Sequence, residues 1–182
     1  MLESLITSET RIRLLLKFFL NPKNRGYLRQ LAKEFKESTN SIRVELNKLT
    51  EAQILDAEYK GRNRIYKANT SHPLFEDIRS IVMKSTGIDK VLSDILKRLG
   101  PVYTAFIRGD YARGIDSGLI DLVIVGDDIN TRELERVRGK TENLIRRKIS
   151  VLLLNREEYG NLMHMFDEES VLVLIHAAAE KE

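Results

Sequence analysis

Apolar residues recur at helical spacing at the start of the chain. Ile12 and Leu15 lie on the apolar face of a helix predicted over residues 8–20. Pro22 is expected to end this helix, because the residue before a proline avoids the α region. The polar residues 23–26 are then expected to form a loop.

Two more helices are predicted after this loop. Apolar residues at i, i+3, i+4 and i+7 indicate a helix over residues 28–35. The next helix begins near Ser38 or Thr39, which are both favourable N-cap residues. It buries Ile42 and Leu46 and leaves a polar face toward solvent.

Two short extended runs follow, at residues 54–60 and 64–68. The three residues 61–63 between them include a glycine, a loop length that suits a β-hairpin. We therefore expect a hairpin whose tip carries Lys60, Arg62 and Arg64.

The middle of the chain is predicted to be helical. Pro73 is placed to occupy the first position of a helix that runs to about residue 84. Gly87 breaks this helix, and a further one covers residues 89–99. We interpret residues 71–99 as a connector between two domains, with an apolar surface suited to dimerisation.

From residue 102 the pattern changes to alternating strands and helices. Strands are predicted at residues 102–108, 119–125, 149–154 and 171–175, and helices at 130–147 and 156–165. Asn130 and Glu133 have the spacing of a capping box. Residues 119–125 are almost all apolar, as in a strand of a sheet that is covered on both faces or by one layer of helices.

These elements predict a mixed α/β protein with three parts. Residues 1–70 would form a helical domain with a hairpin, 71–99 the connector, and 100–182 a small α/β domain.

Composition narrows the choice of compartment. The sequence contains no cysteine, which excludes disulfides and cysteine chemistry and is compatible with a reducing compartment. The longest apolar runs are too short to cross a bilayer, and the N-terminus does not have the order of charges of a signal peptide. A cytoplasmic protein without membrane association is expected.

Positive charge is concentrated in the first domain. Residues 1–70 hold 14 Lys and Arg against 8 Asp and Glu, a balance of +6, whereas the rest holds 16 against 19, a balance of −3. A basic domain suits a polyanion such as DNA, because phosphate contacts release counterions. A solvated charged surface without a partner would show the same balance.

The order helix, helix, turn, helix and basic hairpin is that of a winged helix-turn-helix. Its third helix has the size to enter the major groove of double-stranded DNA, and the hairpin to lie beside it on the phosphates. The alternatives are an ordinary surface helix and a domain that binds proteins. The candidate DNA-binding residues are Thr39, Asn40, Ser41, Arg43, Asn47, Lys48, Lys60, Arg62 and Arg64.

Several runs within residues 8–80 resemble a known family. They include Tyr27-Leu28-Arg29-Gln30-Leu31-Ala32-Lys33, Asn40-Ser41-Ile42-Arg43-Val44-Glu45-Leu46-Asn47-Lys48-Leu49 and Gly61-Arg62-Asn63-Arg64-Ile65-Tyr66. Together they are similar to winged-helix transcriptional repressors of the arsenic-sensing type. The resemblance implies a homodimer on a palindromic site.

The second half resembles the small nucleotidyltransferases of the polymerase-beta type over about residues 88–175. The motif residues are Gly109-Asp110-Tyr111-Ala112-Arg113-Gly114 and Ser117-Gly118-Leu119-Ile120-Asp121. The resemblance implies two carboxylates at i and i+2 on one strand face and a third on a neighbouring strand, which hold metal ions.

This chain departs from that pattern at the residues that carry the chemistry. Leu119 and Ser150 stand where the resemblance implies acids, and only Asp121 remains. Asp110 replaces a phosphate-binding serine and would repel a triphosphate. Gly109 and Gly114 are expected to keep their role in turn geometry.

The remaining residues of this region leave two questions open. Arg113 is expected to pair with Asp116 or Asp121, with ligand binding as the alternative. A second hypothesis is that Asp110 and Asp121 together rebuild a single magnesium site. Otherwise no metal or cofactor is expected, because the three histidines are not at metal-binding spacing.

The sequence therefore predicts a DNA-binding transcriptional regulator and not an enzyme. Its second domain would serve in assembly or sense a small molecule or nucleotide through Gly109, Asp110, Arg113 and Asp121. The alternative is an active metal-dependent nucleotidyltransferase that carries a nucleic-acid-binding domain.

Overall fold

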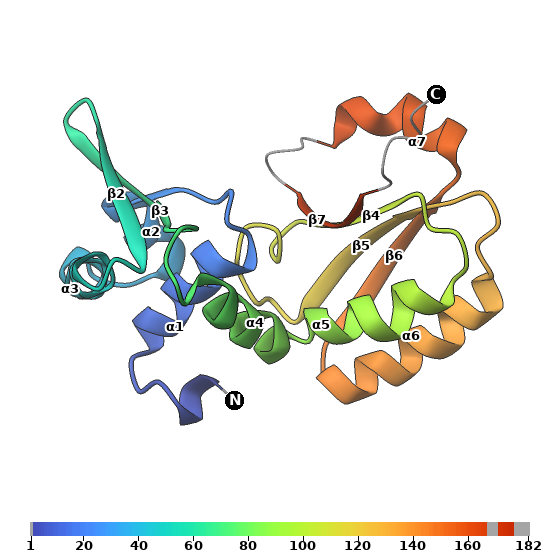
Figure 1. Ribbon diagram of the computed structural model, residues 1–182, viewed down its shortest axis with the longest axis horizontal. Coiled ribbons are helices and arrows are strands. Elements are labelled where there is room, and N and C mark those ends of the chain that lie inside the picture. The colour runs from blue at the N-terminus through green and yellow to red at the C-terminus, as the bar shows by residue number, and fades with distance from the viewer. Residues whose placement is uncertain (1, 167–170, 177–182) are drawn as a thin grey trace. The chain divides into compact units, whose positions relative to one another are not determined.

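The computed structural model describes residues 2–166 and 171–176. The chain forms two compact units, Met1–Ser85 and Thr86–Glu182, and each contains helices and one β-sheet (Figure 1). The division falls inside the stretch 71–99 that the sequence suggests as a connector. Within the described residues, no helix combines the length and the apolar character needed to cross a membrane.

The first unit begins with helices η1 (Leu2–Ser4), α1 (Glu9–Leu15), η2 (Leu16–Leu20), α2 (Leu28–Phe35) and α3 (Thr39–Glu51). The hydroxyl of Ser8 caps α1 by accepting from the Arg11 amide at 3.2 Å. Ser38 caps α3 in the same way, by accepting from the Ser41 amide at 3.0 Å. These helices confirm the three predicted from apolar spacing.

The helices of this unit share one apolar core. Its fully buried side chains include Leu14, Phe18, Phe19, Leu20, Leu31, Ile42, Leu46 and Leu55. Phe19 also packs on Phe75, with ring centroids 5.5 Å apart. Burial of these faces, at about 25 cal/mol per Å² of apolar surface, is the main force that holds the helices together.

The sheet of the first unit contains β1 (Gly26–Tyr27), β2 (Leu55–Lys60) and β3 (Asn63–Ala68), in the antiparallel order β1-β3-β2. Strands β2 and β3 form the expected hairpin, with Lys60 paired to Asn63 across the turn. The prediction of a loop through Gly26 was wrong, because Gly26 pairs with Tyr66 of β3. A strand of two residues is too short to show an alternating pattern.

Helix α4 (Phe75–Thr86) begins later than expected. The prediction placed Pro73 at its first position, but residues before Phe75 form turns, in which His72 Nδ1 accepts from the Leu74 amide at 3.1 Å. Gly87, with φ of 83°, separates α4 from the next helical stretch. That stretch comprises α5 (Ile88–Lys90), η3 (Val91–Ile95) and η4 (Leu96–Arg98).

The second unit is built on a mixed sheet of four described strands, β4 (Thr104–Arg108), β5 (Leu119–Val125), β6 (Lys148–Leu154) and β7 (Leu172–His176). Their order is β6-β5-β4-β7, in which β5 and β6 are parallel and the other pairs antiparallel. Helix α6 (Thr131–Ile145) joins β5 to β6, and α7 (Arg156–Leu162) continues into η5 (Met163–Met165).

Helices cover both faces of this sheet, one of the two arrangements that the apolar run of β5 predicts. Figure 1 shows α5 and α6 along one face and α7 on the other. On the α7 side, Phe106, Val123 and Leu154 form a core against Tyr159 and other apolar residues. The opposite face buries Ile120, Leu122 and Ile124.

The capping box of this unit lies at a different helix from the predicted one. Asn130 does accept from the Glu133 amide at 3.0 Å, but the Glu133 carboxylate pairs with Arg136. A complete capping box instead joins Asn155 and Glu158 at the start of α7.

Candidate nucleic-acid interface

One face of α3 is polar and open to solvent. Thr39, Asn40, Arg43 and Asn47 are all exposed along it. They lie on the side opposite the buried Ile42, Leu46 and Leu49, and helical spacing accounts for this separation. Their amide, hydroxyl and guanidinium groups can hydrogen-bond base edges or phosphates.

Ser41, another candidate from the sequence, is less exposed than these residues. It is half-buried, and its hydroxyl lies 3.4 Å from the hydroxyl of Thr10 in α1. The Ser41 side chain therefore helps to hold α3 on α1.

An ion pair fixes the orientation of α3. Arg11 Nε donates to Glu45 Oε2 at 2.7 Å, and Lys48 Nζ lies 3.4 Å from Glu45 Oε1. Burial opposes the ionisation of Glu45, but hydrogen bonds and charge from Arg11, and from Lys48, outweigh it and lower its pKa. Lys48 remains half exposed, so its ammonium can also reach a phosphate.

The turn between α2 and α3 is tied to α1 as well. Glu37 accepts a hydrogen bond from the Thr10 hydroxyl and lies 3.6 Å from Arg13. Lys36 adopts a left-handed conformation with φ of 56°, which ends α2 and turns the chain toward α3. These contacts make α1, the turn and α3 one rigid frame.

The hairpin presents positive charge at its tip. Lys60 and Arg62 are exposed there, and Arg64 is half-buried with its guanidinium 5.3 Å from the centre of the Tyr66 ring. Arg64 is therefore partly engaged by a cation–π contact, whereas Lys60 and Arg62 are directed to solvent.

Two exposed apolar residues of this surface were missed from the sequence. Val44 is 43% exposed within the polar face of α3, and Tyr59 is 78% exposed next to the hairpin tip. The available signals were a β-branched residue on a polar helix face and an aromatic residue between charged neighbours. Both place apolar surface in contact with solvent.

The loop after β4 has the expected glycine geometry. Gly109 and Gly114 have φ of 71° and 78°, in the left-handed region that glycine adopts without strain. A Cβ on Gly109 would lie 3.2 Å from Asp121 Oδ2, so the loop passes close to Asp121.

Arg113 pairs within this loop and not with the expected partners. Its guanidinium binds the carboxylate of Asp110, three residues earlier. Asp116 instead binds Arg147, and the Tyr111 hydroxyl donates to it. The prediction of Asp116 or Asp121 as the partner of Arg113 was therefore wrong.

The Asp116 cluster lies at the edge of the core: Tyr111 is buried, whereas Asp116 and Arg147 remain partly open to solvent. Burial raises the pKa of the fully buried Tyr111, and its hydrogen bond to Asp116 raises it further, so the phenol is a neutral donor. Burial also opposes the ionisation of Asp116, but hydrogen bonds from Arg147 and Tyr111 prevail and lower its pKa. The cluster links the loop to the start of β6.

The strand register shows what surrounds Asp121, the one acid that remains from the nucleotidyltransferase pattern. Asp121 is paired to Arg108 of β4 on one side and to Ser150 of β6 on the other. Leu119, two residues before Asp121 and on the same face, is 44% exposed. Among the described residues, no group of three or more His, Asp or Glu could hold a metal ion.

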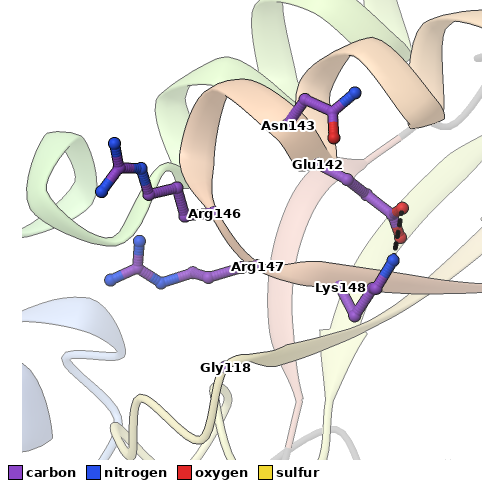
Figure 2. Close-up of a pocket in the computed structure, with 6 residues that line it drawn as sticks. All are labelled: Gly118, Glu142, Asn143, Arg146, Arg147 and Lys148. Carbon is purple, nitrogen blue, oxygen red and sulfur yellow. Dashed lines mark hydrogen bonds and ion pairs between the residues drawn. The ribbon is translucent and has the colours of Figure 1, made fainter.

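A basic pocket lies near the beginning of β5 and β6. It has a volume of about 310 Å³ and is lined by Gly118, Glu142, Asn143, Arg146, Arg147 and Lys148 (Figure 2). The parallel pairing of β5 and β6 brings Gly118 to Lys148, whose amide donates to the Gly118 carbonyl at 2.9 Å. None of the basic residues of this pocket was a candidate from the sequence.

Comparison of the chain with protein-family models, with curated proteins and with solved structures gives no significant match.

Proposed function

We propose that this protein is a transcriptional regulator that binds double-stranded DNA through a winged helix-turn-helix. Helix α3 would enter the major groove, and the β2–β3 hairpin would act as the wing on the phosphates. The observation that carries the proposal is the joint exposure of Asn40, Arg43 and Asn47 on one face of α3, in the same unit as the basic hairpin tip.

The rigidity of α3 supports this proposal. A reading helix must hold its side chains in register with the base edges, and Glu45 and the turn residue Glu37 both connect to α1. The positive balance of residues 1–70 supplies the long-range attraction to a polyanion.

Selection from a random pool of duplexes with the purified chain tests the proposal. Enrichment of a common sequence is expected, and two-fold symmetry in that sequence would support the homodimer that the family resemblance implies. No duplex binding even at low salt would refute DNA recognition and favour a role in protein contact.

Two variants separate base contacts from phosphate contacts. Arg43→Ala should weaken binding to the selected site more than to random duplex, by about 1–3 kcal/mol. Arg62→Ala should weaken binding to all duplexes alike and reduce the salt slope by about one unit. Arg132→Ala, an exposed cation in the second unit, is the control that should change neither.

For the second unit we propose a nucleotidyltransferase-like fold without catalysis, used for assembly or ligand sensing. Support comes from the strand row in which Asp121 faces Arg108 and Ser150, with Leu119 at the other position expected to hold an acid. A single carboxylate in this row gives little to hold the metal ions of such a reaction.

Incubation of the protein with labelled nucleotides and magnesium tests whether the second unit lacks catalysis. No transfer to protein, RNA or small acceptors is expected. Sustained turnover that is lost in Asp121→Ala would establish the alternative, an active nucleotidyltransferase. A thermal shift on adding magnesium or manganese that is lost in the same variant would support a metal site at Asp110 and Asp121.

A further inference from the structure

The basic pocket of the second unit carries an inference that the DNA-binding surface does not involve. Three consecutive cations, Arg146, Arg147 and Lys148, line it together with one carboxylate, that of Glu142. Its volume of about 310 Å³ lies at the lower end of the range for small-molecule sites. What the pocket can bind depends on which of these charges is already engaged.

Arg147 is engaged within the protein. Its guanidinium binds the Asp116 carboxylate in a bidentate pair, with Nε 3.0 Å from Oδ1, and Nη1 donates to the Ile145 carbonyl at 2.8 Å. Hydrogen bonding to Asp116 raises the pKa of Arg147 above the ordinary value of an arginine. This residue therefore forms a fixed positive wall of the pocket and cannot turn freely toward a ligand.

Lys148 is only loosely held. Its side chain is 81% exposed, and Nζ lies 3.5 Å from Glu142 Oε2, at the limit of a hydrogen bond. Glu142 makes its stronger contact elsewhere, because its Oε1 accepts from the Ile149 amide at 2.7 Å. Lys148 can therefore leave Glu142 for a ligand while Glu142 keeps its place.

Arg146 is exposed and has no ion pair among the described residues. Figure 2 shows its guanidinium directed to the same side of the pocket as that of Arg147. Arg146 ends α6 in a left-handed conformation, with φ of 55°, where glycine or asparagine is favoured. This conformation costs free energy for a residue with a Cβ, and the attraction between the Arg146 charge and the helix C-terminus offsets part of that cost.

We propose that this pocket binds a small phosphate-bearing anion through Arg146 and Lys148. Two guanidinium donors of Arg146 can grip two phosphate oxygens, next to the fixed positive charge of Arg147. Figure 2 shows the Lys148 ammonium on the other side of the pocket, at Glu142, and the exposed Lys148 side chain would turn away from Glu142 to add its charge. Asn143 lines the pocket and offers an amide donor, and Gly118 has open space where a side chain would otherwise project. The phosphate is either a free ion or part of a nucleotide.

This inference specifies the ligand sensed by the second unit in the proposed function. It does not depend on DNA binding, and its test contains no DNA. A failure to bind duplexes would thus leave it standing, and its own failure would leave DNA recognition intact.

The test is calorimetric titration of the full chain with inorganic phosphate, pyrophosphate or ATP, without divalent metal and at constant ionic strength set by chloride. Saturable binding of at least one of them is expected. Equal affinity for pyrophosphate and ATP would assign the site to the phosphate groups alone, and tighter binding of ATP to a nucleotide. No saturable binding of any probe would overturn the proposal.

Arg146→Gly is the decisive variant, because it removes the charge and relieves the left-handed backbone. It should weaken binding about ten- to a hundredfold, the value of a charge-assisted hydrogen bond, while the unliganded melting temperature does not fall. Lys148→Gln should weaken binding by a smaller factor. Lys140→Ala removes an exposed cation of the same helix outside the pocket and should leave affinity unchanged.

The variants also separate this site from binding elsewhere. Loss of affinity in Arg146→Gly with an unchanged or higher melting temperature supports the pocket directly. Unchanged affinity in both Arg146→Gly and Lys148→Gln, or an equal loss in Lys140→Ala, would overturn the proposal. Those results would mean that the anions bind another surface or respond only to net charge.

Discussion

Arg11 of the first helix donates its Nε to Glu45 Oε2 of the third helix at 2.7 Å, across 34 positions of sequence. The pair lies on the side of α3 that faces α1, whereas Asn40, Arg43 and Asn47 are open to solvent. The residue that orients α3 and the residues proposed to read DNA are thus on different sides of one helix. A change at Glu45 should therefore act on stability first.

Glu45→Gln should lower the free energy of unfolding by about 1 kcal/mol, because it removes a charge-assisted hydrogen bond from a side chain that is only 10% exposed. Urea denaturation at neutral pH measures this difference. The control is Glu51→Gln at the exposed end of α3, which should change stability by less than about 0.5 kcal/mol. Equal losses in the two variants would contradict the role of the Arg11 pair.

The left-handed residue between α2 and α3 allows a prediction of the opposite sign. Lys36→Gly should stabilise the protein by about 1 kcal/mol, since φ of 56° strains any residue with a Cβ. Lys33→Gly, three residues earlier within α2, should destabilise it by about 1 kcal/mol. Thermal denaturation of the two variants checks the signs, and a loss of stability in both would be evidence against this geometry.

Acid should weaken the second unit through Asp116. Because the folded-state pKa of Asp116 lies below its ordinary value of 3.8, the unfolded chain takes up a proton before the folded chain does. Its contribution to stability is complete above about pH 4 and is lost as the pH falls through the folded-state pKa.

The expected result is that Asp116→Asn is less stable than the wild type at pH 7 and that the gap narrows below pH 4. Urea denaturation at pH 7, 4 and 3 measures it. Asp128→Asn removes an exposed loop carboxylate with no ion pair among the described residues and should show no such narrowing. A gap that stays constant down to pH 3 would rule out Asp116 as the source.

The sequence predicted those helices and strands in which one periodic pattern of apolar residues extends over many positions. Strand β5 and helix α3 have seven and thirteen residues, and their apolar positions set both the type and the buried face. Strand β1 has two residues and exists only because Tyr66 and Ile65 pair with it. No local pattern records such a pairing.

The site residues show the same division between local and long-range information. Asn40, Arg43 and Asn47 became candidates because they share the polar face of one helix. Arg113 has acids three residues away on both sides, and only the turn conformation brings Asp110 to it. The basic pocket depends on the parallel pairing of β5 with β6. The family resemblance implied that these strands are neighbours, but no local pattern indicated that the cations at residues 146–148 line a pocket with Gly118.

Val44 leads to a prediction about the DNA sequence itself. It is 43% exposed on the same side of α3 as Asn40, Arg43 and Asn47, and no polar group of its own can bind a base. In the major groove, the apolar feature of base edges is the 5-methyl group of thymine. If α3 enters that groove, Val44 should contact a thymine methyl in each selected half-site.

Replacing each thymine of the selected duplex by uracil, one position at a time, removes only that methyl group. At one position per half-site, binding measured by fluorescence anisotropy should weaken about fourfold, which corresponds to the roughly 0.8 kcal/mol gained by burying one such group. Val44→Ser should bind the thymine and uracil duplexes equally. Asn47→Ala should bind more weakly overall and still distinguish them, because it leaves the valine in place. Binding by the wild type that is indifferent to uracil at every position would show that Val44 does not face a thymine, even if the protein binds DNA.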